Sequence, residues 1–125
     1  NPDAVKAALD TLAELEGEQV LVLGDMGELG ADELQQHQDV GQYAAAKHID
    51  SLLSCGVLSR AAHDGFIAAG GQNAQHFTDK KALLRYLQQL PTSQRVLLVK
   101  GSRSAGMDQI VMGLTNDGST AGGSH

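Results

Sequence analysis

The apolar run Val20-Leu21-Val22-Leu23 passes directly into a glycine-rich loop, Gly24-Asp25-Met26-Gly27-Glu28-Leu29-Gly30. Four consecutive aliphatic residues without polar alternation are typical of a parallel strand that is covered on both faces. A helical pattern follows from about Asp32 to Lys47 and places His37 on its apolar stripe. A strand, a tight turn and a helix in this order predict the first β-α unit of an α/β domain.

The rest of the chain continues this alternation. Further helices are predicted at residues 2–16, 58–69 and 79–90 and after residue 104, and further strands at residues 49–54, 74–77 and 95–100. Right-handed crossovers with helices on both faces give third, second, first, fourth as the simplest strand order. We therefore predict a three-layer, Rossmann-like, doubly wound α/β fold with a mainly parallel sheet of about four strands. The run from Arg95 to Lys100 is expected to be its clearest buried strand.

Composition narrows the class of protein. The 125 residues suit one globular domain, and hydrophobic residues make up 42% of them. The net charge of -6, with two tyrosines, two phenylalanines and no tryptophan, disfavours nucleic-acid binding, which needs basic tracks and stacking rings. No apolar run reaches the roughly 18–20 residues of a membrane span. The single cysteine, Cys55, excludes an internal disulfide and fits the reducing cytoplasm.

Both ends of the sequence carry local signals. Asn1-Pro2-Asp3 combines a favoured N-cap, a favoured first helical residue and an acid that suits the helix dipole. A helix that begins at the first residue leads us to expect a domain cut from a longer chain. We expect that domain over residues 1–117 and a flexible tail over residues 118–125. Gly122-Gly123-Ser124-His125 resembles the start of an expression tag.

The predicted strand order places a ligand site where the first and fourth strands end side by side. The first of these ends carries Asp25 and Glu28. Its glycines are spaced G-x-x-G-x-x-G instead of G-x-G-x-x-G, and its acids oppose a pyrophosphate, so a free-standing dinucleotide site is disfavoured. Two interpretations remain open. The glycines permit only a tight turn, or the carboxylates face a cation, an amine or a hydroxyl group.

The loop after the fourth strand, Lys100-Gly101-Ser102-Arg103-Ser104, is basic. Two cations, a hydroxyl and free amides at an expected helix N-terminus suit a carboxylate or a phosphate. The alternative is an ion pair between Lys100 and Asp25, with Arg103 in solvent. One acidic and one basic loop together suit a zwitterionic ligand, such as an amino acid or a small peptide.

The remaining polar residues suggest little chemistry of their own. His37 is expected to be buried and hydrogen-bonded, because it lies on an apolar stripe. His48, His63 and His76 lack the spacing of metal ligands, so no metal site is predicted. The sequence holds neither a G-x-x-x-x-G-K-[ST] loop nor a Gly-x-Ser-x-Gly elbow. The residues alone therefore indicate an α/β ligand-binding domain that belongs to an enzyme.

Several segments together resemble the Mur ligases over about residues 1–117, in the C-terminal domain of the branch that adds D-alanyl-D-alanine. They are Asn1-Pro2-Asp3, Ala7-Ala8-Leu9, Val22 to Gly30, His37, Val40-Gly41, Leu98 to Ser104 and Met107. The resemblance implies an ATP-dependent ligase that joins D-alanyl-D-alanine to the UDP-MurNAc-tripeptide carboxylate through an acyl phosphate. ATP and Mg²⁺ would be bound mainly by a central domain of the full-length enzyme, and a further domain would bind the UDP-sugar. This chain would act as a lid without activity or tight ligand binding of its own.

The resemblance also assigns residues. Asn1 would border the nucleotide, and Asp25, Met26 and Glu28 would face the substrate cleft. Lys100, Ser102 and Arg103 would bind substrate, with Ser102 and Arg103 on the dipeptide carboxylate. His37 would lie in a second shell around this site, and no residue of this chain would be catalytic by itself.

One alternative of another class is a stand-alone flavodoxin-like or regulatory ligand-binding module, in which the acidic loop binds Mg²⁺ or a partner. A receiver-like module needs an acid at the end of its middle strand. The second strand ends in Ser54-Cys55-Gly56, which disfavours that version.

Overall fold

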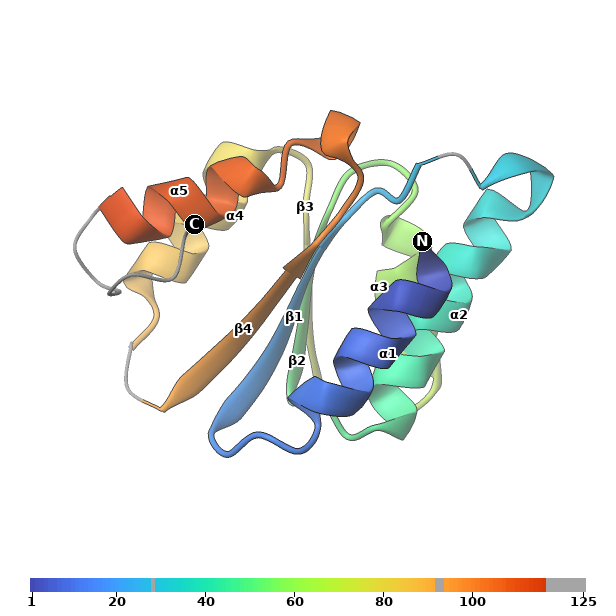
Figure 1. The fold of residues 1–125 in the computed structure, drawn as a ribbon, viewed down its shortest axis with the longest axis horizontal. Coiled ribbons are helices and arrows are strands. Elements are labelled where there is room, and N and C mark those ends of the chain that lie inside the picture. Colours follow the sequence, from blue (N-terminus) through green and yellow to red (C-terminus); the bar gives the residue numbers. More distant parts are fainter. Residues whose placement is uncertain (28, 92–93, 117–125) are drawn as a thin grey trace.

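Four parallel strands form one sheet in the order β3-β2-β1-β4 (Figure 1). The computed structural model describes residues 1–27, 29–91 and 94–116. The strands are β1 (Glu18–Gly24), β2 (Ser51–Cys55), β3 (Asn73–Phe77) and β4 (Arg95–Lys100). In register, Val22 of β1 lies between Leu53 of β2 and Val99 of β4. The predicted doubly wound fold and its strand order are confirmed.

Helices cover both faces of the sheet, as Figure 1 shows. One face carries α1 (Pro2–Leu12), α2 (Glu33–Ala46) and α3 (Arg60–Ala68), and the other carries α4 (Lys80–Gln89) and α5 (Asp108–Asn116). Two short 3₁₀ turns, η1 (Gly30–Asp32) and η2 (Arg103–Ala105), lie in the loops after β1 and β4. None of the helices in the described ranges is long and apolar enough to cross a membrane.

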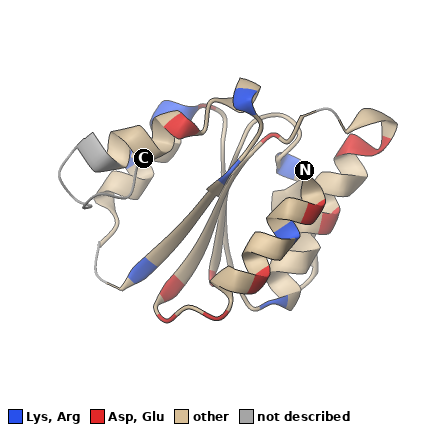
Figure 2. Cartoon of the chain, viewed as in Figure 1, with Lys and Arg blue, Asp and Glu red and all other residues tan. Residues whose placement is uncertain are grey.

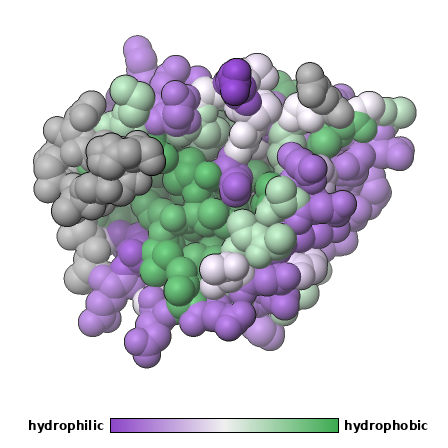
Figure 3. Space-filling model, in the orientation of Figure 1, coloured by the Kyte–Doolittle hydropathy of each residue, from purple (hydrophilic) through white to green (hydrophobic). Residues whose placement is uncertain are grey.

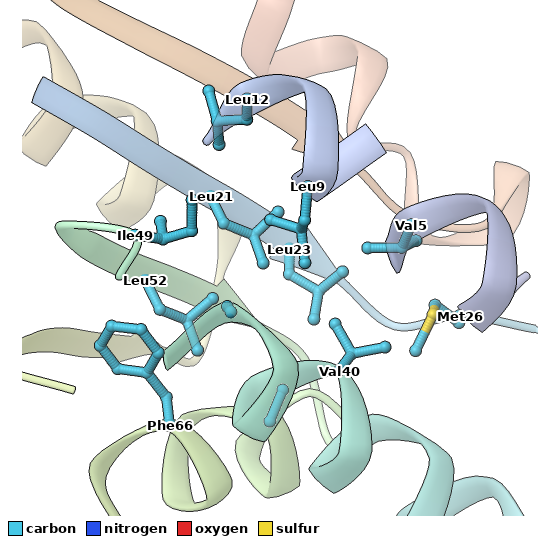
Figure 4. Packing of buried hydrophobic residues seen from close by; sticks show 12 residues of the cluster. Val5, Leu9, Leu12, Leu21, Leu23, Met26, Val40, Ile49, Leu52 and Phe66 are labelled. Carbon is cyan, nitrogen blue, oxygen red and sulfur yellow. The ribbon is translucent and has the colours of Figure 1, made fainter. Parts of the chain in front are cut away.

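The two cores follow from the alternation of side chains along β1. Leu21 and Leu23 point to the face of α1, α2 and α3, where they join Leu9, Val40 and Phe66 (Figure 4). Their neighbours Val20 and Val22 belong to a second cluster beneath α4 and α5. Each fully buried aliphatic or aromatic side chain stabilises the fold by roughly 1.5–3 kcal/mol. Both hydrophobic cores consist of residues of this chain.

The strand β4 differs from its prediction as the clearest buried strand. All six of its residues, Arg95 to Lys100, are only partly buried. The reason is topological, because β4 pairs with β1 alone and forms one edge of the sheet. Apolar surface accordingly gathers over this edge in Figure 3.

The first helix is shorter than the predicted span of residues 2–16. It ends at Leu12, and the amides of Glu14 and Leu15 then turn back to Thr11 and Leu12 in tight turns. The amide of Glu18 donates to the carbonyl of Gln94, so β1 begins its pairing with the neighbouring chain segment at this residue. Leu15 is 45% exposed.

A polar contact joins α1 to α2. The Tyr43 hydroxyl donates to the Asp10 carboxylate at 2.5 Å, and Lys47 Nζ lies 3.2 Å from the same oxygen. These contacts, first the Tyr43 hydrogen bond and then Lys47, hold the pKa of Asp10 below its ordinary range. Hydrogen bonding to the Asp10 carboxylate likewise raises the pKa values of Tyr43 and Lys47.

Replacing Tyr43 with phenylalanine is expected to lower Tm slightly at pH 7. A carboxyl whose pKa is depressed by folding stabilises the protein above its unfolded-state pKa, and this contribution is lost as the pH falls through the folded-state value. The difference between wild type and Tyr43→Phe should therefore shrink below the ordinary Asp pKa of 3.8. Thermal melts from pH 7 to pH 2 measure it. The control is Tyr86→Phe, because no partner of the Tyr86 hydroxyl is recorded in the described part of the chain. A difference that persists unchanged at pH 2 would contradict this account.

Candidate functional site

The loops after β1 and β4 meet at the carboxyl edge of the sheet, as the strand order predicts. The Ser102 amide donates to the Asp25 carbonyl at 2.8 Å. Above the strand ends, a Cβ atom on Gly24 would lie 2.5 Å from Cγ of Met107, and one on Gly101 would lie 3.3 Å from Cα of Gly24. Glycine at these positions therefore allows the two strand ends to approach each other beneath Met107.

Both oxygens of the Asp25 carboxylate accept a backbone hydrogen bond within the protein. Oδ1 accepts a hydrogen bond from the Ser59 amide at 2.8 Å, and Oδ2 accepts one from the Val57 amide at 3.1 Å. Both amides belong to the loop that leads into α3, whose N-terminus favours a negative charge. The geometry therefore favours a structural carboxylate over one that faces a ligand. Glu28, the other acid predicted for this loop, lies outside the described residues.

The Met26 side chain lies in the core and not at the surface of the loop. It is only 1% exposed and packs beside Val40 (Figure 4), so its burial disfavours the predicted contact with substrate. An apolar residue in a glycine-rich loop has no periodicity that distinguishes core from cleft. Its backbone amide, however, donates to Nε2 of His37 at 2.9 Å.

His37 connects the first loop to α2. It is completely buried, Nε2 accepts from Met26, and Nδ1 donates to the Glu33 carbonyl at 2.7 Å. Since an amide can only donate, these two contacts assign the neutral tautomer with its proton on Nδ1. The prediction of a buried, hydrogen-bonded histidine is confirmed.

Two clefts flank the basic loop. The first, of about 720 Å³, is lined by Asn1, Gly27 and the segment Ser102 to Ser104, so it joins the start of the chain to the loop after β4. Asn1 uses Oδ1 to accept from the amides of Asp3 and Ala4, which leaves its Nδ2 group to donate to a ligand.

The second cleft, of about 590 Å³, lies between the end of β4 and α5. Lys100 and Arg103 supply cations, and its other lining residues are Val99, Gly101, Ser102, Met107, Asp108 and Val111. Figure 2 shows basic residues at the end of β4 and on η2, along the same edge of the molecule. Arg103 is exposed and borders both clefts. A cationic group beside apolar side chains suits a small carboxylate that carries aliphatic groups.

The local structure of this loop differs from the predicted helix N-terminus. Ser102 caps the short turn η2, and its Oγ accepts from the Ala105 amide at 3.2 Å. Gly106 then adopts a left-handed conformation (φ 68°), and α5 begins only at Asp108. An anion would therefore meet the side chains of Lys100 and Arg103 instead of helix amides. Within the described residues no salt bridge joins Lys100 to Asp25, so that alternative is not observed.

Sequence reasoning missed Lys80, the first residue of α4. Its Nζ donates to the Ala105 carbonyl at 3.1 Å, across the loop that carries Arg103. The sequence did contain a hint of this contact. Lys80 and Lys81 begin a helix, and a helix N-terminus disfavours cations, so a lysine there suggests an interaction outside the helix.

Among the described residues near these loops, the Cys55 thiol is not activated as a nucleophile. Burial raises the pKa of the Cys55 thiol, with Asp79 and Asp25 adding to the effect, so the thiol stays protonated near neutral pH. Burial also lowers the pKa of His76, with the charges of Arg60 and His63 adding to it, and Nδ1 of His76 lies 2.7 Å from the Ser54 hydroxyl. Across residues 1–27, 29–91 and 94–116, no group of three or more His, Cys, Asp or Glu residues is arranged to hold a metal ion.

Comparison with known proteins identifies the family. The model of the Mur ligase, glutamate ligase domain, matches residues 1–103. This chain belongs to the Mur ligase family. The Mur ligase resemblance carried by the two loop motifs is thereby confirmed.

Two named relatives show which Mur ligase this domain is similar to. It is 43% identical over 120 residues to UDP-N-acetylmuramoyl-tripeptide–D-alanyl-D-alanine ligase of Escherichia coli K12, covering 94% of this chain and 25% of that protein. The ligase of the same name from Bacillus subtilis is 33% identical over 122 residues, covering 91% of this chain and 26% of that protein. The chain thus spans about a quarter of the length of these relatives.

Solved structures agree with the fold. MurF from Acinetobacter baumannii superposes with a TM-score of 0.79 at 29% identity, covering 93% of this Mur ligase domain and 25% of that protein. MurF ligase from Thermotoga maritima, solved in complex with ADP, has a TM-score of 0.75. At 16% identity over 94% of this chain and 26% of that one, the second match concerns the fold alone.

Proposed function

We propose that this chain is the C-terminal domain, over about residues 1–117, of an ATP-dependent ligase that joins D-alanyl-D-alanine to a UDP-MurNAc-tripeptide. The observation that carries the proposal is the basic edge formed by Lys100 and Arg103. It borders the cleft beside Asn1 and a second cleft whose lining combines apolar side chains with Asp108. A carboxylate-bearing dipeptide of two alanines matches that chemistry. The names of the relatives point to the same acceptor.

The reaction class sets what such a domain must do. The terminal carboxylate of the tripeptide takes the γ-phosphoryl group of ATP and becomes an acyl phosphate. The dipeptide amine then attacks the carbonyl carbon, and the tetrahedral intermediate expels inorganic phosphate as the peptide bond forms. Water competes with the amine for the acyl phosphate. A closing domain that orients the amine and excludes water therefore favours ligation over hydrolysis.

The residues divide between binding and support. The Arg103 guanidinium and the Lys100 ammonium bind the dipeptide carboxylate, and Ser102 shapes their loop. Asn1 donates through Nδ2 toward the nucleotide. Asp25 and His37 hold the first loop through backbone amides. Glu28 is proposed to face the substrate cleft.

Nucleotide and metal belong mainly to other parts of the ligase in this proposal. The MurF ligase of Thermotoga maritima was solved in complex with ADP, which agrees with a nucleotide-dependent reaction in this group of ligases. The described residues do not fit Mg²⁺, because the Asp25 carboxylate is already bound by two amides and no cluster of ligands is present among them. This chain's partners are accordingly the N-terminal and central domains of the same ligase. By itself it has neither ligase nor ATPase activity.

The stand-alone regulatory module finds no support. The second strand ends without an acid, and the Asp25 carboxylate that would bind Mg²⁺ or a partner is engaged by the loop before α3. The family match and the ligase names of the relatives favour the ligase.

Arg103→Ala in the complete ligase tests the proposal. Hydrogen bonds to charged groups are worth about 1.5–3 kcal/mol, so KM for D-alanyl-D-alanine should rise roughly 10- to 100-fold. The KM values for ATP and for the tripeptide should stay within about twofold. Arg85→Ala, at an exposed arginine of α4, is the matched control. An unchanged KM for the dipeptide would exclude Arg103 as its carboxylate ligand.

A further inference from the structure

The first turn of α4 carries a cation where a cation is unfavourable. Asp79 caps this helix by accepting from the Ala82 amide at 2.8 Å, and Lys80 and Lys81 follow at once. Positive charge near a helix N-terminus opposes the helix dipole. Helix stability therefore does not explain Lys80, and its contact elsewhere must.

That contact is with the end of η2. Lys80 Nζ donates to the carbonyl of Ala105, the last residue of the turn, at 3.1 Å. The last carbonyls of a helical turn have no partner within it, and a lysine is well suited to bind them. The hydrogen bond is partly buried, which shields it from competing water.

Gly106 makes room for this contact. Its φ of +68° reverses the chain between η2 and α5, and a Cβ atom at this position would lie 2.6 Å from Lys80 Nζ. A side chain here would meet both an unfavourable backbone conformation and the ammonium group.

The turn is thus held at both ends. At its start, the Ser102 amide donates to the Asp25 carbonyl, and at its end Lys80 binds Ala105. Arg103 lies between these points, and its side chain forms no ion pair within the described residues. The backbone of η2 therefore sets where the Arg103 guanidinium projects.

We propose that Lys80 is a positioning residue for Arg103: by binding the Ala105 carbonyl, it fixes the turn from which Arg103 reaches the acceptor. This inference rests on the proposed role of Arg103 as ligand of the dipeptide carboxylate. Lys80 does not touch the substrate in this account. It reduces the conformations that Arg103 samples before the dipeptide binds.

Steady-state kinetics of the complete ligase test the role. Lys80→Met should raise KM for D-alanyl-D-alanine about tenfold, the loss of one hydrogen bond to a charged group, with kcat and KM for ATP within about twofold. Lys80→Arg should restore most of the affinity, because it keeps a cationic donor. Lys81→Met, at the exposed neighbour, should change nothing. Equal effects of the Lys80 and Lys81 variants would overturn the proposal.

A double-mutant cycle separates positioning from direct binding. If Lys80 acts only through Arg103, Lys80→Met should have no further effect on KM in the Arg103→Ala background. Additive effects would overturn the proposal, since Lys80 would then bind substrate itself.

Amide hydrogen exchange of the 125-residue chain separates failure of this inference from failure of the proposed function. Lys80→Met should speed exchange at Ala105 and Gly106 at least tenfold and leave Val57, in the loop before α3, unchanged. Unchanged exchange at Ala105 would overturn the positioning role whatever Arg103 binds. Faster exchange together with an unaffected KM in Arg103→Ala would instead refute the proposed ligand of Arg103.

Discussion

Replacing His37 with leucine is expected to lower the free energy of unfolding by about 3 kcal/mol. The imidazole is completely buried and makes two hydrogen bonds, one from the Met26 amide and one to the Glu33 carbonyl. Leucine fills a similar space but leaves the Met26 amide without an acceptor. A buried donor without a partner costs about 1–3 kcal/mol, and the altered shape adds to this.

Urea denaturation, monitored by circular dichroism, measures the free energy of unfolding of His37→Leu and of the wild type. His37→Gln should recover part of the stability, because the glutamine carbonyl reaches about as far as Nε2 and accepts the same amide proton. His63→Leu is the control, since the hydrogen bond of His63 goes to the exposed Asp64 and should contribute less than about 1 kcal/mol. Equal losses in the two leucine variants would show that the Met26 amide contributes nothing specific.

Most of the fold could be predicted because it rests on patterns that are local in sequence. Apolar runs such as Val20 to Leu23 mark parallel strands, and the handedness of crossovers then leaves one simple strand order. The exposure of β4 could not be predicted in the same way. A run of aliphatic residues looks alike in a central strand and in an edge strand, and only the completed order shows that β4 pairs on one side.

The location of the site could be predicted from the sequence, but the hydrogen-bond partners and the backbone conformation within it could not. Strand order alone brought Asp25 and Ser102 together, since both follow strands that end at the switch point. The partners of Asp25 depend on the conformation of the loop before α3, which no local pattern specifies. The interruption at Gly106 was missed for a similar reason. A single glycine is also tolerated inside a helix, so the sequence does not show that the backbone becomes left-handed at this position.

Taken together, the contacts make the carboxyl edge one connected unit. The Asp25 carbonyl binds the loop after β4, its carboxylate binds the loop after β2, and His37 anchors the next residue to α2. Lys80 adds the first turn of α4 to the same network. Loops with fixed mutual positions lose less entropy when a ligand binds, which suits the binding roles proposed for Arg103 and Asn1.

Gly41→Ala is expected to destabilise the fold by about 3 kcal/mol, although alanine is the better helix former. A glycine inside a helix normally costs about 1 kcal/mol relative to alanine, so propensity alone predicts a gain. Gly41 is buried in α2, however, and a Cβ atom there would overlap the backbone carbonyl of Ala62 in α3. Gly65 of α3 makes the reciprocal approach, since its Cβ atom would lie 2.6 Å from the Gln38 carbonyl oxygen. A backbone obstacle cannot rotate away as a side chain can, so the two helices must separate and disturb the core beneath them.

Chemical denaturation of three variants decides between packing and propensity. Gly41→Ala and Gly65→Ala should both be destabilised, and their combined loss should be smaller than the sum, because one separation of α2 from α3 relieves both overlaps. Ala46→Gly, at the exposed end of α2, is the control and should lose no more than about 1 kcal/mol. If Gly41→Ala were more stable than wild type, the close approach of α2 and α3 would be excluded, because only helix propensity would then be acting at this position.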